Sequence, residues 1–336
     1  MSIRSWVIRS WVIRSWALRI LAVVVAAWIG LISPTTALAA PSWKIEDVTS
    51  TGQSGVSPHV ERTADGDLLF RSDGPSGTVA SLCRAFQCSP VAFTSGGGPV
   101  NDFTVATLPN GSKRGYFVDV NPNTGMKTVS SAPCLDAACL AIGARTPINP
   151  EASVPMTTKA WGVPDAVVLP DGRVRIYMVE SPVPGRCTEK IASYISSDGV
   201  AFTKEPGWRL ENGYVDTEVL RAKDGAWVMI LADIGCTADG NQKLFVSESA
   251  DGLAWSKPQV LTGAGTSKLD PTGYEVSDNV FRIYYATSGS SPGQFGSIEG
   301  ATLVLGKASK TISCKKGSKI IKVTGTKCPR GTKLVR

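Results

Sequence analysis

The sequence has a single histidine, His59, and its eight cysteines include no C-x2-C pair. Structural zinc sites use closely spaced Cys and His ligands, so the sequence argues against one. After residue 40, no apolar run approaches the ~20 residues that a membrane-spanning helix requires. We therefore expect neither a metal nor a cofactor as an essential part of the molecule, with a central structural ion as the alternative, and no transmembrane segment in the mature chain.

Acidic residues are absent from both ends of the chain. Four of the 35 Lys and Arg residues lie in residues 1–40 and ten in residues 307–336, so the remaining 21 face 28 acidic residues in the body. An acidic body repels phosphate, which excludes a nucleic-acid binder. The ten cations of the tail predict salt-sensitive binding to an anionic cell envelope, and a solvated tail that only aids solubility is an equal alternative.

Residues 1–39 have the pattern of a secretory signal peptide. The segment begins with Arg-bearing residues, continues through an uncharged run from Ile20 to Ile32, and ends in Ala37-Leu38-Ala39, a small-x-small cleavage site. A membrane anchor is the alternative, but Pro34 interrupts the apolar stretch. We expect cleavage and a secreted, extracellular protein.

The eight cysteines of an exported chain are expected to form disulfides. Two pairs have C-x4-C spacing, which suits a hairpin staple, and a third pair lies alone in the tail. The last pair follows by elimination. The predicted bridges are Cys83–Cys88, Cys134–Cys139, Cys314–Cys328 and Cys187–Cys236.

The body contains five similar segments, each reading strand, tight turn, strand. They begin at Ser57, Asn101, Val163, Val215 and Leu269. Their turns carry residue pairs that adopt positive φ readily: Asp65-Gly66, Asn110-Gly111, Asp171-Gly172, Asp224-Gly225 and Asp278-Asn279. Further strand-like runs follow each hairpin, so each unit has the size of a four-stranded propeller blade.

The fifth unit lacks a fourth strand, and the run WKIEDVT from Trp43 can supply it. The sequence therefore predicts an all-β fold, a five-bladed β-propeller over residues 40–306 closed by its N-terminal strand. A long β-sandwich is the less favoured alternative. Residues 307–336 are expected to form a separate basic tail, a small disulfide-stapled β-hairpin.

Carboxylates gather where the innermost strands begin. Alignment on the turns places Ser57, Asp102, Val163, Asp216 and Asp270 at one position and His59, Thr104, Asp165, Glu218 and Thr272 two residues further in, on the same side of each strand. Five carboxylates thus converge on one channel mouth. Trp161, just before the third segment, is a candidate for stacking on a sugar, and His59 and Asp216 are further candidate binding residues.

Crowded, partly desolvated carboxylates acquire separated pKa values, which supplies the acid and base of glycoside hydrolysis. The alternative for any one of them is structural, because Asp at the start of a propeller strand often caps backbone amides. Asp216 and Asp270 are candidates for caps. Asp165 and Glu218 are the stronger candidates for catalysis.

The segments VPDAVVLPDGRVRIYMV and LDPTGYEVSDNVFRIYYA, with the turn SADGLAW, resemble the five-bladed propellers of the furanosidase superfamily, which includes glycoside hydrolase family 43. The resemblance implies an Asp base in the first blade, an orienting Asp in the third and a Glu acid in the fourth. Asp165 then matches the orienting residue and Glu218 the acid, each displaced by two positions relative to its turn. The first blade has Ser57-Pro58 in place of Asp-Pro, so Asp102 or Asp270 would serve as base.

Two functions follow as hypotheses. The first is a secreted glycosidase acting on a glycan, with Glu218 as acid, Asp165 orienting it, and Asp102 or Asp270 as base. The second is a non-catalytic propeller that binds a carbohydrate or a surface at the same mouth. We expect a monomer in either case.

Overall fold

The structure is a computed structural model that describes residues 42–121, 123–158, 160–236, 238–289, 295–306, 311–324, 328 and 330–335. The predicted signal peptide lies outside these residues. Ser42–Gly306 form one compact unit, and the residues from Thr311 onward belong to another. Within the described segments, no helix is long and apolar enough to cross a membrane.

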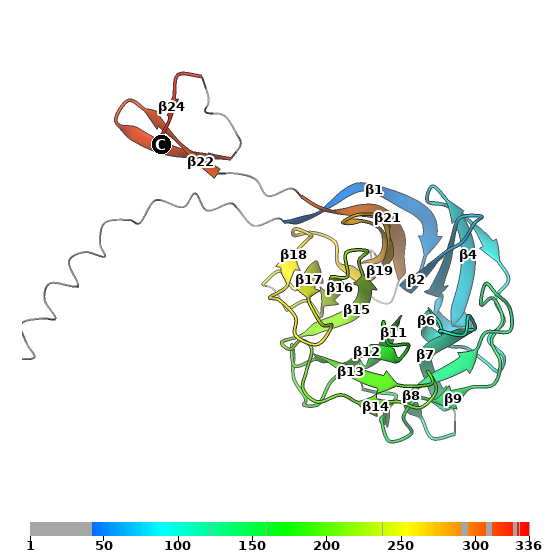
Figure 1. Ribbon diagram of the computed structural model, residues 1–336. Coiled ribbons are helices and arrows are strands. Elements are labelled where there is room, and N and C mark those ends of the chain that lie inside the picture. Colours follow the sequence, from blue (N-terminus) through cyan, green and yellow to red (C-terminus); the bar gives the residue numbers. More distant parts are fainter. Residues whose placement is uncertain are drawn as a thin grey trace, which may run out of the picture. The chain divides into compact units, whose positions relative to one another are not determined.

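Five antiparallel sheets of residues 42–306 surround a common centre, which confirms the predicted five-bladed β-propeller (Figure 1). The first blade comprises β2 (Val56–Arg62), β3 (Asp67–Ser72), β4 (Thr78–Arg84) and β5 (Gln87–Val91), with a 3-10 turn at Gly74–Ser76. The second comprises β6 (Asn101–Thr107), β7 (Lys113–Asn121), β8 (Met126–Pro133), β9 (Thr146–Pro147) and β10 (Ser153–Pro155). The third comprises β11 (Gly162–Val168), β12 (Val174–Glu180), β13 (Lys190–Ser196) and β14 (Thr203–Lys204). The fourth comprises β15 (Tyr214–Arg221), β16 (Trp227–Asp233), β17 (Leu244–Ser249) and β18 (Gln259–Val260).

The fifth blade is completed from the other end of the propeller sequence, as predicted. Its strands are β19 (Lys268–Ser277), β20 (Val280–Ser288), β21 (Phe295–Leu305) and β1 (Trp43–Ser54), and β1 pairs antiparallel with β21. This pairing covers the edge that β21 would otherwise expose. The N-terminal strand therefore closes the ring.

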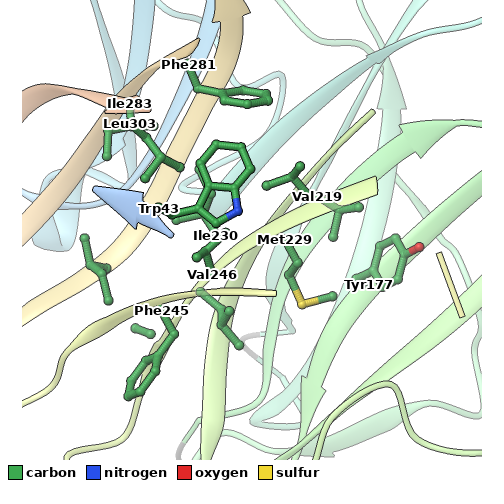
Figure 2. Close-up of a cluster of buried hydrophobic side chains, with 14 of the residues drawn as sticks. Trp43, Tyr177, Val219, Met229, Ile230, Phe245, Val246, Phe281, Ile283 and Leu303 are labelled. Atoms are coloured by element: carbon green, nitrogen blue, oxygen red, sulfur yellow. The ribbon is translucent and has the colours of Figure 1, made fainter. Parts of the chain in front are cut away.

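Trp43 fixes the start of this closing strand. Its indole is 5% exposed and lies 5.6 Å from the ring of Phe281, centroid to centroid. Figure 2 shows it between side chains of the fifth blade and the fourth-blade residues Ile230 and Val246. The indole N–H also donates to Glu248 at 2.9 Å. One side chain thus joins the core of two neighbouring blades.

The hairpin turns lie at the ends of the innermost strands, and glycine is needed where neighbouring backbone approaches. At Gly66, φ is +144° and a Cβ would lie 2.4 Å from the carbonyl oxygen of Cys83. All four predicted disulfides are present, including the long-range Cys187–Cys236 bridge. The pairing inferred from spacing and elimination is therefore confirmed.

The C-terminal unit is a small sheet in the order β23-β22-β24, built from β22 (Thr311–Lys316), β23 (Lys319–Thr324) and β24 (Lys333–Leu334). The predicted hairpin is present and gains a short third strand, which pairs beside Cys314. Cys314 is fully buried and bonded to Cys328, so the disulfide ties the third strand's segment to the hairpin.

Candidate active site

The five innermost strands bring their first residues together around one axial cavity of about 30 Å3. Its lining includes all five carboxylates that the sequence placed at the channel mouth: Asp102, Asp165, Asp216, Glu218 and Asp270. The volume corresponds to roughly one water molecule. The alignment of the repeats therefore located a real cluster of acids on the axis.

Each innermost strand contributes one residue near its start to what we call the outer ring. These residues are Ser57, Asp102, Val163, Asp216 and Asp270. Each has a left-handed backbone, with φ between 48° and 52°. Each also lies in a register shift where the innermost strand bulges against its neighbour. Left-handed backbone is unfavourable for residues with a Cβ, above all for a β-branched valine, and bulges redirect side chains. One strained bulge, repeated in every blade, thus shapes the mouth.

Hydrogen bonds link the outer ring from blade to blade. The Ser57 hydroxyl donates to Asp102 Oδ1 at 2.6 Å, and the Ser57 N–H donates to Asp270 Oδ2 at 2.9 Å. Asp216 and Asp270 share a hydrogen bond between their side chains. Two carboxyl groups bonded to each other hold one proton between them. Asp216 and Asp270 therefore form a proton-sharing pair.

Burial separates the pKa values in the outer ring. It raises the pKa of Asp102 to about 6, opposed by the hydrogen bond from Ser57. Burial, reinforced by the charge of Asp270, raises the pKa of Asp216 well above its usual value. Burial raises the pKa of Asp270 too, although the bond from the Ser57 N–H opposes this. Asp102 is therefore the carboxyl group of the ring that ionises near pH 6, whereas Asp216, bonded to Asp270, holds its proton more strongly than a free aspartate does.

Two residues deeper lies the inner ring: His59, Thr104, Asp165, Glu218 and Thr272. Four of its side chains accept a backbone N–H from another blade. The bonds are Val105 N–H to His59 Nε2 at 3.2 Å, Val219 N–H to Asp165 Oδ2 at 2.7 Å, Gly273 N–H to Glu218 Oε1 at 3.2 Å and Val60 N–H to Thr272 Oγ1 at 3.1 Å. The inner ring therefore fastens innermost strands to one another.

Asp165 and Glu218 also interact electrostatically. Burial raises the pKa of Asp165 to about 6, against the opposing bond from Val219. Burial and the charge of Asp165 raise the pKa of Glu218 well above its usual value. These two residues, which sequence reasoning favoured for catalysis, thus combine an acid–base difference with a structural role between blades.

His59 is 7% exposed and sits on the inner ring. Its Nε2 accepts the Val105 N–H, which assigns the ring proton to Nδ1, 3.3 Å from Thr104 Oγ1. The only histidine of the chain therefore has a hydrogen-bonded, buried role. Trp161 is 6% exposed and packs in a core cluster with Tyr116 and Val118. Its indole is therefore not an open platform for a sugar.

Two contributors were missed from the sequence. Ser57 was dismissed as a base, yet it donates to two carboxylates of the outer ring. Lys127 of β8 interacts with Asp102, and its ammonium donates to the Thr158 carbonyl at 2.6 Å. No turn-based alignment singles out Lys127, because it comes from the third strand of its blade. Among the described residues, no group of three or more His, Cys, Asp or Glu is arranged to hold a metal ion.

No family model matches the sequence, and no curated protein matches it. Solved structures do match. A thermostable family-43 glycoside hydrolase has a TM-score of 0.54 at 11% identity, covering 88% of this chain and 99% of its own. The endo-arabinase of Bacteroides thetaiotaomicron gives 0.54 at 13%, with 77% and 97% covered. An N-acetylgalactosamine deacetylase from F. plautii gives 0.52 at 11%, with 79% and 95% covered. Likeness at this identity establishes the fold and leaves the reaction open.

Proposed function

We propose that this protein hydrolyses a glycosidic bond at the axial cavity, using the outer ring. The observation that carries the proposal is the meeting of three carboxyl groups at the axial cavity, Asp102 on the second blade and the hydrogen-bonded pair of Asp216 and Asp270 on the fourth and fifth blades. In a ring of five, one blade separates Asp102 from the pair on either side. Asp102 and the pair are thus the candidate base and acid that hydrolysis of a glycosidic bond requires.

The proposed reaction adds water across the bond. Asp102 accepts a proton from a water molecule as the water oxygen attacks the anomeric carbon. The pair of Asp216 and Asp270 gives its proton to the departing sugar oxygen. The Ser57 hydroxyl orients Asp102. The cavity matches the volume of one water, so the sugar itself would lie above the mouth.

This assignment replaces Glu218 as acid. Glu218 lies on the inner ring and accepts the Gly273 N–H, and the resemblance matched it only with a displacement of two residues. The outer ring needs no displacement. The resemblance implies carboxylates on blades one, three and four. The outer ring has them on blades two, four and five, which is the same spacing around the ring, shifted by one blade.

The test is a screen of the purified protein on aryl furanosides and pyranosides. We expect turnover that Asp102→Asn strongly lowers, while Asp278→Asn, which alters an exposed acid at the tight turn of the fifth blade, retains it. Turnover unaffected by Asp102→Asn would overturn the assignment. Binding of glycans without turnover by the unaltered protein would support the non-catalytic propeller instead.

We also propose secretion, with cleavage after the N-terminal signal, and adsorption to an anionic envelope through the basic tail. In support, the tail sheet places like charges directly opposite each other, at Lys316 and Lys319 and at Lys315 and Lys333. Such pairs are unfavourable until an anion compensates them. Removal of residues 307–336 should abolish low-salt adsorption to envelope fragments, and unchanged adsorption would refute this role.

A further inference from the structure

A second cavity, of about 330 Å3, lies where the first and fifth blades meet. Its lining includes Arg62, the last residue of β2, whereas the lining of the axial cavity includes Ser57, near the start of that strand. The two cavities therefore lie at opposite ends of β2. We call the second cavity the seam cavity. Three arginines line it: Arg62, Arg84 and Arg282. In a body where acidic residues outnumber basic ones, this is a local reversal of charge.

Each guanidinium is held by a different anchor. Arg62 lies over the ring of Tyr274, 5.6 Å from its centroid. Arg84 donates through Nε to the Asp65 carbonyl at 2.9 Å. Arg282 donates through Nη1 to Asp67 Oδ2 at 3.0 Å. Because a guanidinium carries five N–H donors, each of these contacts leaves further donors for a ligand. Anchoring lowers the entropy lost when a ligand binds.

Two acidic residues also line the seam cavity, Asp65 and Asp67, so the three arginines outnumber them by one. Asp67 is buried, with 3% of the residue and 4% of its side chain exposed, and it accepts hydrogen bonds from the hydroxyls of Tyr274 and Tyr284, both at 2.5 Å, as well as from Arg282. Its charge is compensated within the wall. In the described part of the chain, Arg62 and Arg84 form no ion pair, and both are exposed. Two cations therefore remain available at the cavity.

We propose that the seam cavity binds a monosaccharide-sized anion, with its carboxylate or phosphate held by Arg62 and Arg84. Guanidinium groups match the paired oxygens of such groups, and the bonds are strengthened by charge. The volume lies within the range of small-molecule sites. This site is separate from the axial cavity and does not depend on the proposed hydrolysis.

The experiment is isothermal titration calorimetry of the full chain with glucuronate, glucose 6-phosphate and uncharged glucose. We expect the two anions to bind, more weakly as salt is raised, and glucose not to bind. The double variant Arg62→Gln/Arg84→Gln should weaken binding by about tenfold or more. Both side chains are exposed, so the variant is expected to fold, and circular dichroism checks this.

The matched control is Arg173→Gln, an exposed arginine paired with Asp171 in the third blade, which should leave the affinity unchanged. The basic tail is present in every variant, so anion binding there adds equally to all titrations. Equal affinity in the double variant and the control would overturn the proposal, as would no binding up to ~10 mM. Inorganic phosphate binding as tightly as the sugar anions would also overturn it, because the cavity would then hold any adventitious ion.

Discussion

The outer and inner rings lie two residues apart on the same five strands, yet they have different roles. Inner-ring side chains accept backbone N–H groups from other blades. The outer ring has left-handed backbone in every blade, and its side chains also bond to one another, although Asp270 accepts the Ser57 N–H from the neighbouring blade. In this propeller, therefore, the cluster of acids is not uniform: four side chains of the deeper layer accept backbone N–H groups between blades, and the strained layer above it contains the carboxylates that we propose for the chemistry.

The largest expected effect is a loss of catalytic activity when an outer-ring residue is changed. Asp102→Asn removes the proposed base while keeping size and hydrogen-bonding capacity, so kcat/KM should fall by about 10²–10⁴. The melting temperature at neutral pH should not fall, because the substitution also removes a buried carboxylate whose ionisation opposes folding. Steady-state kinetics on an aryl glycoside substrate, with thermal unfolding in parallel, measures both quantities. A fall in kcat/KM that follows only a loss of folded protein would mean that the two rings do not differ in the way described.

The second effect separates the rings by stability. Asp165→Ala leaves the buried Val219 N–H without its acceptor, and we expect a loss of about 2–4 kcal/mol in the free energy of unfolding. Asp165→Asn retains an acceptor and should lose less. Urea unfolding measures both variants against the unaltered chain. An Asp165→Ala midpoint equal to that of the unaltered protein would show that the inner ring does not fasten the blades.

The third effect concerns pH and applies to both rings. The folded-state pKa values of Asp102 and Asp165, about 6, lie above the ordinary value of 3.8, so protonation favours the folded state. Their stabilising contribution is complete below about pH 4 and is lost as the pH rises through 6, by roughly 1–3 kcal/mol for each group. Activity should change in the opposite direction, since Asp102 must be ionised to act as base.

Denaturant titrations between pH 4 and 8 check the stability part. Asp102→Asn should remove the part of the pH dependence of the unfolding free energy that comes from Asp102, and it should leave the part that comes from Asp165. A free energy of unfolding that rises over this range, or a slope unchanged in Asp102→Asn, would contradict the assigned shifts.

The fold could be predicted because its determinants are local. Turn pairs such as Asp171-Gly172 recur at a fixed distance from each strand start, and alternating apolar residues mark the strands between them. The irregular outer strands of the blades were harder to predict from the sequence. In the second blade the apolar run Leu140–Ile142 reads as a strand, yet it forms only isolated bridges, and the short strands β9 and β10 pair with β8 instead.

The gathering of the acids at the axis was predictable from the sequence, and the hydrogen bonds that each of them makes were not. Spacing placed Asp165 and Asp216 near the axis, since both depend on position within one strand. Which N–H meets which carboxylate depends on the packing of strands more than 50 residues apart, as for Val219 and Asp165. The left-handed backbone at Val163 has no local signal either, because valine disfavours it. Trp161 was misjudged because a tryptophan suits both a core and a sugar platform.

The smallest effect tests the residue between the rings. Thr217 follows outer-ring Asp216 and precedes inner-ring Glu218, at the position where other blades have Pro58, Phe103, Pro164 and Pro271. Its hydroxyl is buried and has no hydrogen-bond partner among the described residues. Thr217→Val removes an unsatisfied polar atom and should leave the free energy of unfolding unchanged or raise it by up to about 1 kcal/mol.

Thr272→Val is the matched control, because it makes the same exchange at an inner-ring hydroxyl that accepts the Val60 N–H. It should destabilise the protein by about 1–2 kcal/mol, since it leaves a buried donor unpaired. Because the Thr272 hydroxyl also bonds to Glu218, urea unfolding of both variants separates the inter-blade hydrogen bonds of this hydroxyl from the effect of the exchange itself. Equal losses at the two positions would mean that threonine contributes through packing alone, and the inner ring would then owe its role to shape rather than to hydrogen bonding between blades.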